Sequence, residues 1–281
     1  MTANDKIQAM DALFFDEYTS NQAILKYTRA TAGYGISYLL VHDYRDVYSR
    51  ALDQLSPEIK REGIRVLEFG CGGAMNLIQL FSLLRNKGFT VERAVGTDFS
   101  PVLIKSANQE AKNYLPENEA NHLEFHVARN EELVSGLSAA TAGNPEQLAD
   151  SFHLIIGVNT IRYCHAAKKQ FDCARDIYHL LAPGGICVVI DMNNRYPCFR
   201  SDLKNRLRRV KLEQCYVPSL EEYTAPFKDA GFDVLRSQHF CWVPHSAGPL
   251  LTLLFSGLTP LLNLVAKSRA MRSLVVCRKP D

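Results

Sequence analysis

Short apolar runs alternate with stretches of helical periodicity from residue 65 onwards. Five runs are short, rich in aliphatic residues, and predict buried strands, at residues 66–69, 94–97, 123–127, 152–158 and 185–191. Between them, amphipathic stretches at 74–85 and 101–114 predict helices. This alternation is typical of βαβ units, in which consecutive strands pair in parallel. The pattern therefore predicts an α/β fold built on a parallel sheet.

Both ends of the chain add segments to this core. Residues 5–55 have mixed three- and four-residue apolar spacing, broken at residues 32–35, which predicts an N-terminal helical cap over residues 1–55. Residues 56–281 then form the main domain. Two further strands are expected at 232–235 and 273–278, as a C-terminal antiparallel hairpin with an apolar and basic insert at about 242–272. Residues 136–145 are rich in small residues and predict a surface loop.

Composition narrows the class of protein. The 281 residues carry a formal net charge of +2, which does not indicate nucleic-acid binding. The eight cysteines form no C-x-x-C pair, so we expect reduced thiols, no metal site and a cytoplasmic protein. The start of the chain does not resemble a signal peptide. Residues 247–266 are uncharged, but Pro249, Pro260 and several polar residues argue against a membrane-spanning helix.

The strongest local signal is a glycine-rich turn between the first strand and the helix that follows it. Glycines let the backbone approach a ligand, and a helix N-terminus offers unpaired N–H groups, so this turn predicts a ligand site. A dinucleotide fingerprint, G-x-G-x-x-G, begins at Gly70 but has Met75 at its sixth position. An NAD-dependent oxidoreductase therefore becomes the less favoured alternative.

The residues of this turn, Glu68-x-Gly70-x-Gly72-x-Ala74, resemble the first motif of class I S-adenosylmethionine-dependent methyltransferases. The family usually has a third glycine where this chain has Ala74. The later strands and the turn at residues 182–185 follow the family's order over about residues 60–195. The resemblance implies a Rossmann-like, seven-stranded, mostly parallel sheet with helices on both faces.

The resemblance also implies which residues bind S-adenosylmethionine. Asp98, at the end of the second strand, is expected to accept the ribose hydroxyls, and Phe99 to pack on the adenine ring. Arg129 occupies the position of a family aspartate, so the backbone or side chain of Asn130 is expected to meet the adenine. The full set of expected cofactor-binding residues is Glu68, Gly70, Cys71, Gly72, Asp98, Phe99, Arg129, Asn130 and Asn159.

Methyl transfer from a sulfonium requires positioning of the acceptor and exclusion of water, and a base only where the acceptor must lose a proton. Residues near the ends of the fourth and fifth strands supply the catalytic candidates, His165, Tyr163 and Asp191. The substrate candidates are Tyr27, Tyr34, His42, Arg162 and Asn193. The sequence after Asn159 differs from the Asn-Pro-Pro-Tyr or Phe motif of methyltransferases that act on DNA bases or glutamine. The expected acceptor is a small molecule, amphiphilic or aromatic, that is methylated on O, N or S by direct in-line displacement.

Two C-terminal features bear on the acceptor and on partners. Residues 200–211 hold six basic residues and one acid, and residues 250–265 are apolar and precede further cations. Together they predict either a surface for an amphiphilic acceptor or a membrane, or a solvated helix and an insert packed on the core or on a partner subunit. A non-catalytic adenosyl-binding or regulatory protein on the same fold is the rival of another class, and the oligomeric state stays open.

Overall fold

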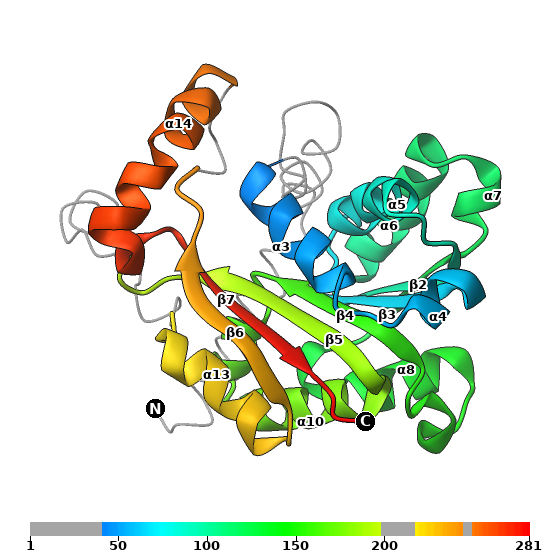
Figure 1. Cartoon of the computed structure of the whole chain (residues 1–281). Coiled ribbons are helices and arrows are strands. Elements are labelled where there is room, and N and C mark those ends of the chain that lie inside the picture. Colours follow the sequence, from blue (N-terminus) through cyan, green and yellow to red (C-terminus); the bar gives the residue numbers. More distant parts are fainter. Residues whose placement is uncertain (1–40, 198–216, 244–248) are drawn as a thin grey trace.

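The computed structural model describes residues 41–197, 217–243 and 249–281 (Figure 1). Its elements follow each other in this order: α3 (His42–Leu52), α4 (Pro57–Glu62), β1 (Ile64–Phe69), α5 (Met75–Asn86), β2 (Val91–Asp98), α6 (Pro101–Tyr114), α7 (Glu117–Ala120), β3 (Leu123–Val127), η2 (Asn130–Glu132), α8 (Leu133–Thr141), η3 (Pro145–Leu148), β4 (Phe152–Val158), α9 (Ile161–Ala166), α10 (Gln170–Leu180), β5 (Leu181–Met192), α13 (Leu220–Asp229), β6 (Asp233–Phe240), α14 (Pro249–Ala266), η5 (Lys267–Arg269) and β7 (Arg272–Arg278).

The strands form one seven-stranded sheet in the order β3-β2-β1-β4-β5-β7-β6. Strands β1 to β5 pair in parallel, whereas β7 lies antiparallel between β5 and β6. The predicted Rossmann-like fold and the antiparallel C-terminal pair are confirmed. Because β6 and β5 are both antiparallel to β7, β6 points the same way as the parallel strands. Its last residues therefore lie at the carboxyl-end edge of the sheet.

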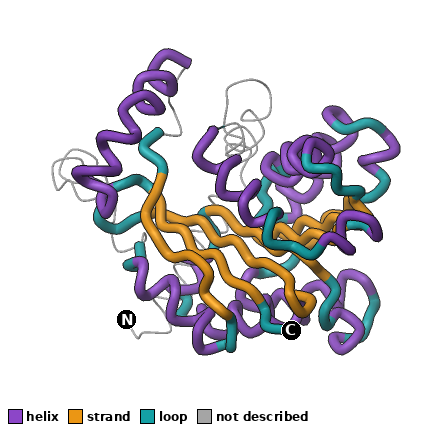
Figure 2. Tube along the Cα trace, viewed as in Figure 1, coloured by secondary structure: helices purple, strands orange, loops and turns teal. Residues whose placement is uncertain are grey.

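Helices cover both faces of the sheet, as Figure 2 shows. Alternate residues of each central strand enter different cores: Ile156 packs with α3, α5 and α6, and Ile155 packs with α8, α10 and α13. Helix α3 belongs to the first of these cores, with Tyr48 and Leu52 fully buried. The described end of the predicted cap therefore packs as part of the main domain. Residues 1–40, the rest of that cap, lie outside the described residues.

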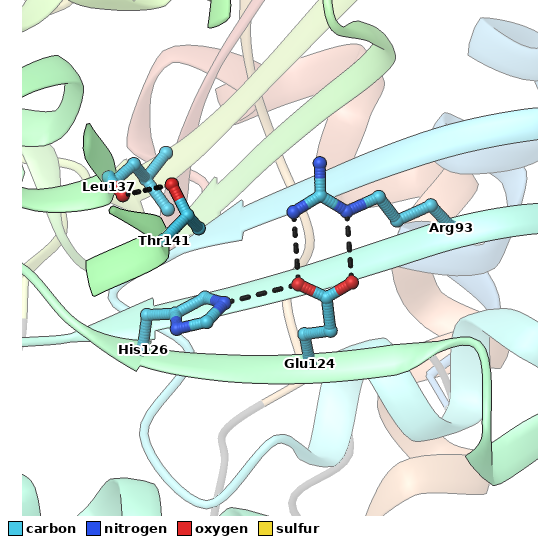
Figure 3. Close-up of polar contacts among 5 residues, drawn as sticks. All are labelled: Arg93, Glu124, His126, Leu137 and Thr141. Carbon is cyan, nitrogen blue, oxygen red and sulfur yellow. Dashed lines mark hydrogen bonds and ion pairs between the residues drawn. The ribbon is translucent and has the colours of Figure 1, made fainter. Parts of the chain in front are cut away.

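The predicted loop at residues 136–145 is wrong over its first half. Helix α8 runs through this segment to Thr141, because Leu133 and Leu137 are spaced one turn apart and both are buried. Thr141 Oγ1 donates a 2.8 Å hydrogen bond to the Leu137 carbonyl, which is drawn in Figure 3. The helix ends at Ala142, which adopts a left-handed conformation. Small residues alone were a poor signal of a loop, since Ala and Ser also fit a helix against a sheet.

The edge strand β3 is tied to β2 by an ionic cluster on one face of the sheet (Figure 3). Arg93 binds Glu124 through Nε at 3.1 Å and Nη2 at 2.9 Å, and His126 Nε2 lies 3.2 Å from the same carboxylate. Hydrogen bonding to Arg93 lowers the pKa of Glu124 below its usual range. The bidentate geometry fixes the register of an otherwise short strand.

The insert between β6 and β7 is one continuous helix, α14, with Pro260 inside it. By length and composition alone, and among the described residues, Leu250–Arg269 is the one helix long and apolar enough to cross a membrane. The prolines therefore do not interrupt the helix, and the expectation that this segment does not span a membrane stays a prediction. Pro260 removes the hydrogen bond to the carbonyl of Ser256, and because Ser256 is exposed, water can satisfy that carbonyl.

Candidate active site

The turn between β1 and α5 contains three residues in the left-handed region. Gly70, Gly72 and Ala74 have φ angles of 64°, 55° and 64°. A Cβ at Gly70 would lie 2.2 Å from Thr160 Cγ2, so no side chain fits there. A Cβ at Gly72 would meet no atom within 4 Å, so the turn faces open space at this point. Ala74 adopts at a cost of about 1 kcal/mol the conformation that a glycine adopts freely.

Glu68 holds this turn from inside the protein. Its side chain is buried and accepts 3.1 Å hydrogen bonds from Asn76 Nδ2 and from the backbone N–H of Leu77, both in the first turn of α5. Burial raises the pKa of Glu68 to about 8. The acid of the motif therefore anchors the helix N-terminus to the strand and fixes the shape of the loop between them.

Asp98 closes the other side of the turn. Its Oδ2 accepts a 3.0 Å hydrogen bond from the backbone N–H of Gly72, and its Oδ1 accepts one of 2.9 Å from that of Ser100. Burial raises the pKa of Asp98 to about 6, although both hydrogen bonds favour the charged form. Because a carboxylate has about four acceptor positions, each oxygen can accept a further hydrogen bond from a hydroxyl.

Asn130 lies beside the same turn. Its Nδ2 atom would be 3.3 Å from a Cβ at Gly70, and its Oδ1 atom is buried with no hydrogen-bond partner within the described part of the chain. Arg129 instead turns to Glu131, with Nε 2.8 Å from the carboxylate, and its side chain is 48% exposed. The geometry thus favours Asn130 over Arg129 as the residue that would contact the adenine ring of a bound cofactor.

Cys71 and Phe99 complete the surroundings of the turn. The backbone N–H of Cys71 donates a 2.8 Å bond to the Thr97 carbonyl, which joins the turn to β2. Its Sγ atom would be 3.0 Å from a Cβ at Gly96, so the thiol fills the space that this glycine leaves. Phe99 follows Asp98 directly and is half-buried. Both residues lie at the edge where the cofactor was expected.

Asn159 lies at the carboxyl end of β4 in a left-handed conformation, with φ of 59°. Its backbone N–H donates a 2.8 Å bond to the Ile190 carbonyl, and its Oδ1 accepts a hydrogen bond from Arg272 Nη1. Arg272 is fully buried at the start of β7, opposite Met192. The sequence reasoning missed Arg272, although a cation directly before an apolar strand was a usable signal.

Asp191 and Arg162 form a second polar group at this edge. Asp191 Oδ2 accepts a 3.1 Å bond from the backbone N–H of Arg162, and its Oδ1 lies 3.7 Å from Arg162 Nη1. The guanidinium lies 4.6 Å from the centre of the Tyr163 ring, and Nη2 donates to the Tyr163 hydroxyl. Three of the predicted residues are therefore in direct contact.

His165 packs against Tyr223, edge to face, with ring centres 5.5 Å apart. Burial lowers the pKa of His165 to about 4, so its imidazole is neutral at pH 7. Burial, with the nearby charge of Asp191, raises the pKa of Tyr223. Tyr223 comes from α13, far along the chain, and no motif in the sequence indicated that it would lie beside His165.

The remaining substrate candidates do not line this group. Asn193 is fully buried and donates from Nδ2 to the carbonyls of Ser268 at 2.9 Å and Ala270 at 2.7 Å, so it fixes the segment before β7. His42 is exposed at the start of α3. Tyr27 and Tyr34 lie outside the described residues, and so does the basic run at 200–211.

The sequence pattern of a methyltransferase domain matches residues 40–237. The chain belongs to the methyltransferase-domain family. Together with the fold, this confirms the predicted class I S-adenosylmethionine-dependent methyltransferase, its enzyme class and its cofactor. It also removes support from the NAD-dependent alternative.

Relatives of this methyltransferase are diverse. It is 28% identical over 148 residues to the citrinin polyketide synthase of Monascus ruber. The matched region covers 52% of this chain and 5% of that much longer protein. A methyltransferase structure from Thermotoga maritima has a TM-score of 0.55 and 15% identity, with 95% and 98% of the two chains covered. Geranyl diphosphate C-methyltransferase from Streptomyces coelicolor, solved with S-adenosyl-L-homocysteine, has a TM-score of 0.51 and 14% identity over 84% and 79%.

The turn of this methyltransferase fits S-adenosylmethionine on three observations. Gly72 faces open space, the Asp98 carboxylate retains acceptor positions, and Asn130 Oδ1 is a buried acceptor without a partner among the described residues. Hydroxyls, an amino group and a flat ring are the features that such a set would bind. Of the expected residues, Gly70, Gly72, Asp98 and Asn130 are brought together at this turn, whereas Arg129 turns away from it. The assignment of these residues to particular atoms of the cofactor stays a prediction.

Proposed function

We propose that this methyltransferase transfers a methyl group from S-adenosylmethionine to an O, N or S atom of a small, amphiphilic acceptor. The proposal rests on the polar group at the carboxyl ends of β4 and β5, next to the cofactor turn, where open α/β sheets bind their ligands. Arg162 and Tyr163, both half-buried, offer hydrogen-bond donors there, and the fully buried Tyr223 and Ile161 belong to the core that α8, α10 and α13 form on this side of the sheet. The apolar helix α14 lies at the same edge of the sheet, which suits an acceptor with a hydrophobic portion.

S-adenosylmethionine supplies a methyl group already activated by its sulfonium. The chain has to orient the acceptor, exclude water and accept a proton where the acceptor is a hydroxyl or amine. His165 is the base in this proposal, because its buried imidazole is neutral at pH 7. Asp191 is a positioning residue, since its carboxylate already binds the backbone of Arg162 and Met192.

The described cysteines support a reducing compartment. Cys71, Cys164, Cys173, Cys187, Cys241 and Cys277 are all free thiols and all buried. Free buried thiols are usual in cytosolic proteins and unusual in secreted ones. We therefore retain the cytoplasm as the proposed site of action.

The observation that carries the cofactor part of the proposal is the Asp98 carboxylate beside the open side of Gly72. Isothermal titration with S-adenosylhomocysteine tests the cofactor part: wild type should bind and Asp98→Ala should bind at least tenfold more weakly. Asp229→Ala, an exposed aspartate on α13, is the matched control and should bind as wild type. No binding by wild type, or equal binding by Asp98→Ala, would sink the cofactor assignment.

Transfer of a labelled methyl group tests the catalytic part. Wild type is incubated with labelled S-adenosylmethionine and a panel of small amphiphilic alcohols, phenols, amines and thiols, and organic extracts are counted. Label in one class of acceptor supports methyl transfer and identifies the atom. Tight binding of S-adenosylhomocysteine with no transfer to any acceptor or cell extract would instead favour the non-catalytic adenosyl-binding protein.

A further inference from the structure

Helix α14 has its polar and apolar faces reversed relative to a helix of a soluble domain. The side that lies toward the protein body carries Thr252, Thr259 and Asn263, all half-buried, together with Phe255. The side that faces away carries apolar residues with spacing of three and four, and Ser256 at its margin is the one exposed polar residue of α14: the apolar residues are Leu250, Leu253, Leu254, Gly257, Leu258, Leu261, Leu264 and Val265. Leu250 is 85% exposed and Leu264 is 83% exposed. A helix normally buries its apolar side, so this surface fits an apolar environment outside the described fold.

The helix is attached to the body through its polar side. Trp242 Nε1 donates a 2.9 Å hydrogen bond to Asn263 Oδ1, and Phe255 packs against the core formed by α3, α5 and α6. Figure 1 shows α14 rising clear of the sheet above the ends of β6 and β7. The orientation of the apolar side is therefore fixed by specific contacts and not by chance.

Charge on this part of the chain is of one sign. The sequence holds no Asp or Glu between Asp233 and Asp281, whereas Lys267 and Arg269 follow α14 directly and are exposed. Arg195 is also exposed near them, because Asn193 binds the carbonyls of Ser268 and Ala270. An apolar helix face with cations at its end is complementary to a surface of anionic lipid.

The sheet decides between a helix that crosses the membrane and one that lies on it. In length, about 27 Å, α14 would nearly span a bilayer core of about 30 Å. However, Arg272 pairs with Phe240, so the chain leaves β6 and enters β7 at neighbouring points of one sheet edge. A single crossing would place these paired strands on opposite sides of the bilayer.

We propose that α14 is a membrane-docking helix that rests its apolar side in one leaflet of a bilayer containing anionic lipid. The cations Arg195, Lys267 and Arg269 then meet the headgroups. Because α14 emerges at the carboxyl-end edge of the sheet, docking turns the candidate active site toward the membrane. The inference concerns binding only and stands or falls independently of the proposed acceptor chemistry.

Vesicle flotation of the full chain tests the proposal. We expect wild type to float with vesicles in which about one third of the lipid is phosphatidylserine, and to float less with phosphatidylcholine alone. Leu253→Glu with Leu264→Glu should weaken binding by on the order of tenfold or more. Leu235→Glu, at another exposed leucine on β6, is the matched control and should bind as wild type. Lys267→Gln with Arg269→Gln should remove the preference for anionic lipid.

Three results would overturn the proposal. Wild type that stays with neither vesicle and is monomeric by light scattering would mean that another segment of the chain covers α14. A dimer that the double glutamate variant dissociates, without vesicle binding, would make the face a contact between two copies. Unchanged flotation of the double glutamate variant, with an unchanged far-UV circular dichroism spectrum, would place lipid binding elsewhere.

Discussion

The carboxylate of Asp98 accepts a 3.0 Å hydrogen bond from the backbone N–H of Gly72. Together with the bond from the Cys71 N–H to the Thr97 carbonyl, this contact joins the end of β2 to the glycine turn that follows β1, across neighbouring parallel strands. It places a carboxylate next to Gly72, a turn glycine whose missing side chain leaves open space. The shape of the turn and the charge that faces its ligand are thus set together.

Affinity for S-adenosylhomocysteine should fall on acidification. The pKa of Asp98 is about 6 in the protein, and only its carboxylate accepts two hydroxyls without donating a proton. Between pH 7 and pH 5 we expect binding to weaken about tenfold, measured by isothermal titration. Asp98→Asn should bind weakly at both values. A wild-type affinity that is constant over this range would show that Asp98 does not titrate in contact with the ligand.

Gly72→Ala should lose the cofactor while keeping the fold. The new Cβ meets no protein atom, so its cost in stability is the left-handed conformation, about 1 kcal/mol. The same methyl group would occupy the space expected for the ligand, and we expect affinity to fall at least tenfold.

Gly88→Ala is the matched control for that substitution. Gly88 has φ of 75° and also has no atom within 4 Å of a Cβ, but it lies beyond the far end of α5. Both variants should lose similar stability in thermal denaturation, and Gly72→Ala alone should lose affinity. Equal ligand binding by the two variants would contradict the prediction that the cofactor lies at the open side of Gly72.

Glu68 should destabilise the protein as the pH rises. Its pKa is raised from the ordinary value of 4.5 to about 8, because burial favours the protonated form in the folded state. The stability that the protonated group contributes is complete below about pH 4.5 and is lost as the pH rises through about 8. Glu68→Gln cannot ionise. The difference in melting temperature between this variant and wild type should therefore shift in favour of the variant as the pH rises from about 5 to about 9. A difference that does not change with pH would mean that Glu68 is ionised throughout.

His165 should act as a base without a titration near neutrality. With a pKa of about 4, its imidazole is already neutral above pH 5, so kcat should stay level from pH 6 to pH 8 for an acceptor that loses a proton. His165→Gln should lower kcat by about 100-fold or more, whereas KM for the cofactor should not change. Tyr163→Phe, which removes a neighbouring hydroxyl, should lower kcat less. An unaffected kcat in His165→Gln would show that no base is needed from this position.

The sequence predicted the elements whose pattern is local. Strands β3 and β4 were predicted to the residue, because each is a short apolar run between turn residues. The cofactor roles of Gly70, Gly72 and Asp98 were predicted from the resemblance of their motifs to those of the methyltransferase family. Helix α8 was missed, because only the packing of Leu133 and Leu137 in the core with α10 and the sheet shows that this segment is helical. Arg272 and Tyr223 were missed for a related reason. Pairing of β7 with β5, and packing of α13, bring them to the site from more than 150 residues beyond Gly70, so their proximity to it depends on contacts between distant segments.

Asn263→Ala should loosen α14 from the body, and the loss should be visible in fluorescence. The chain has a single tryptophan, Trp242, whose indole N–H donates to Asn263 and whose side chain is 8% exposed. Removing the acceptor leaves a buried donor without its partner, which costs about 1–3 kcal/mol locally. We expect the tryptophan emission of this variant to shift. Its fluorescence transition should also occur at a lower denaturant concentration than its far-UV circular dichroism transition, which reports the sheet.

Thr259→Ala is the matched control. Thr259 lies on the same side of α14, but the substitution loses only a bond to the Phe255 carbonyl of its own helix, and it should leave the emission unchanged. Identical emission and transitions in Asn263→Ala and wild type would show that this hydrogen bond does not hold the helix.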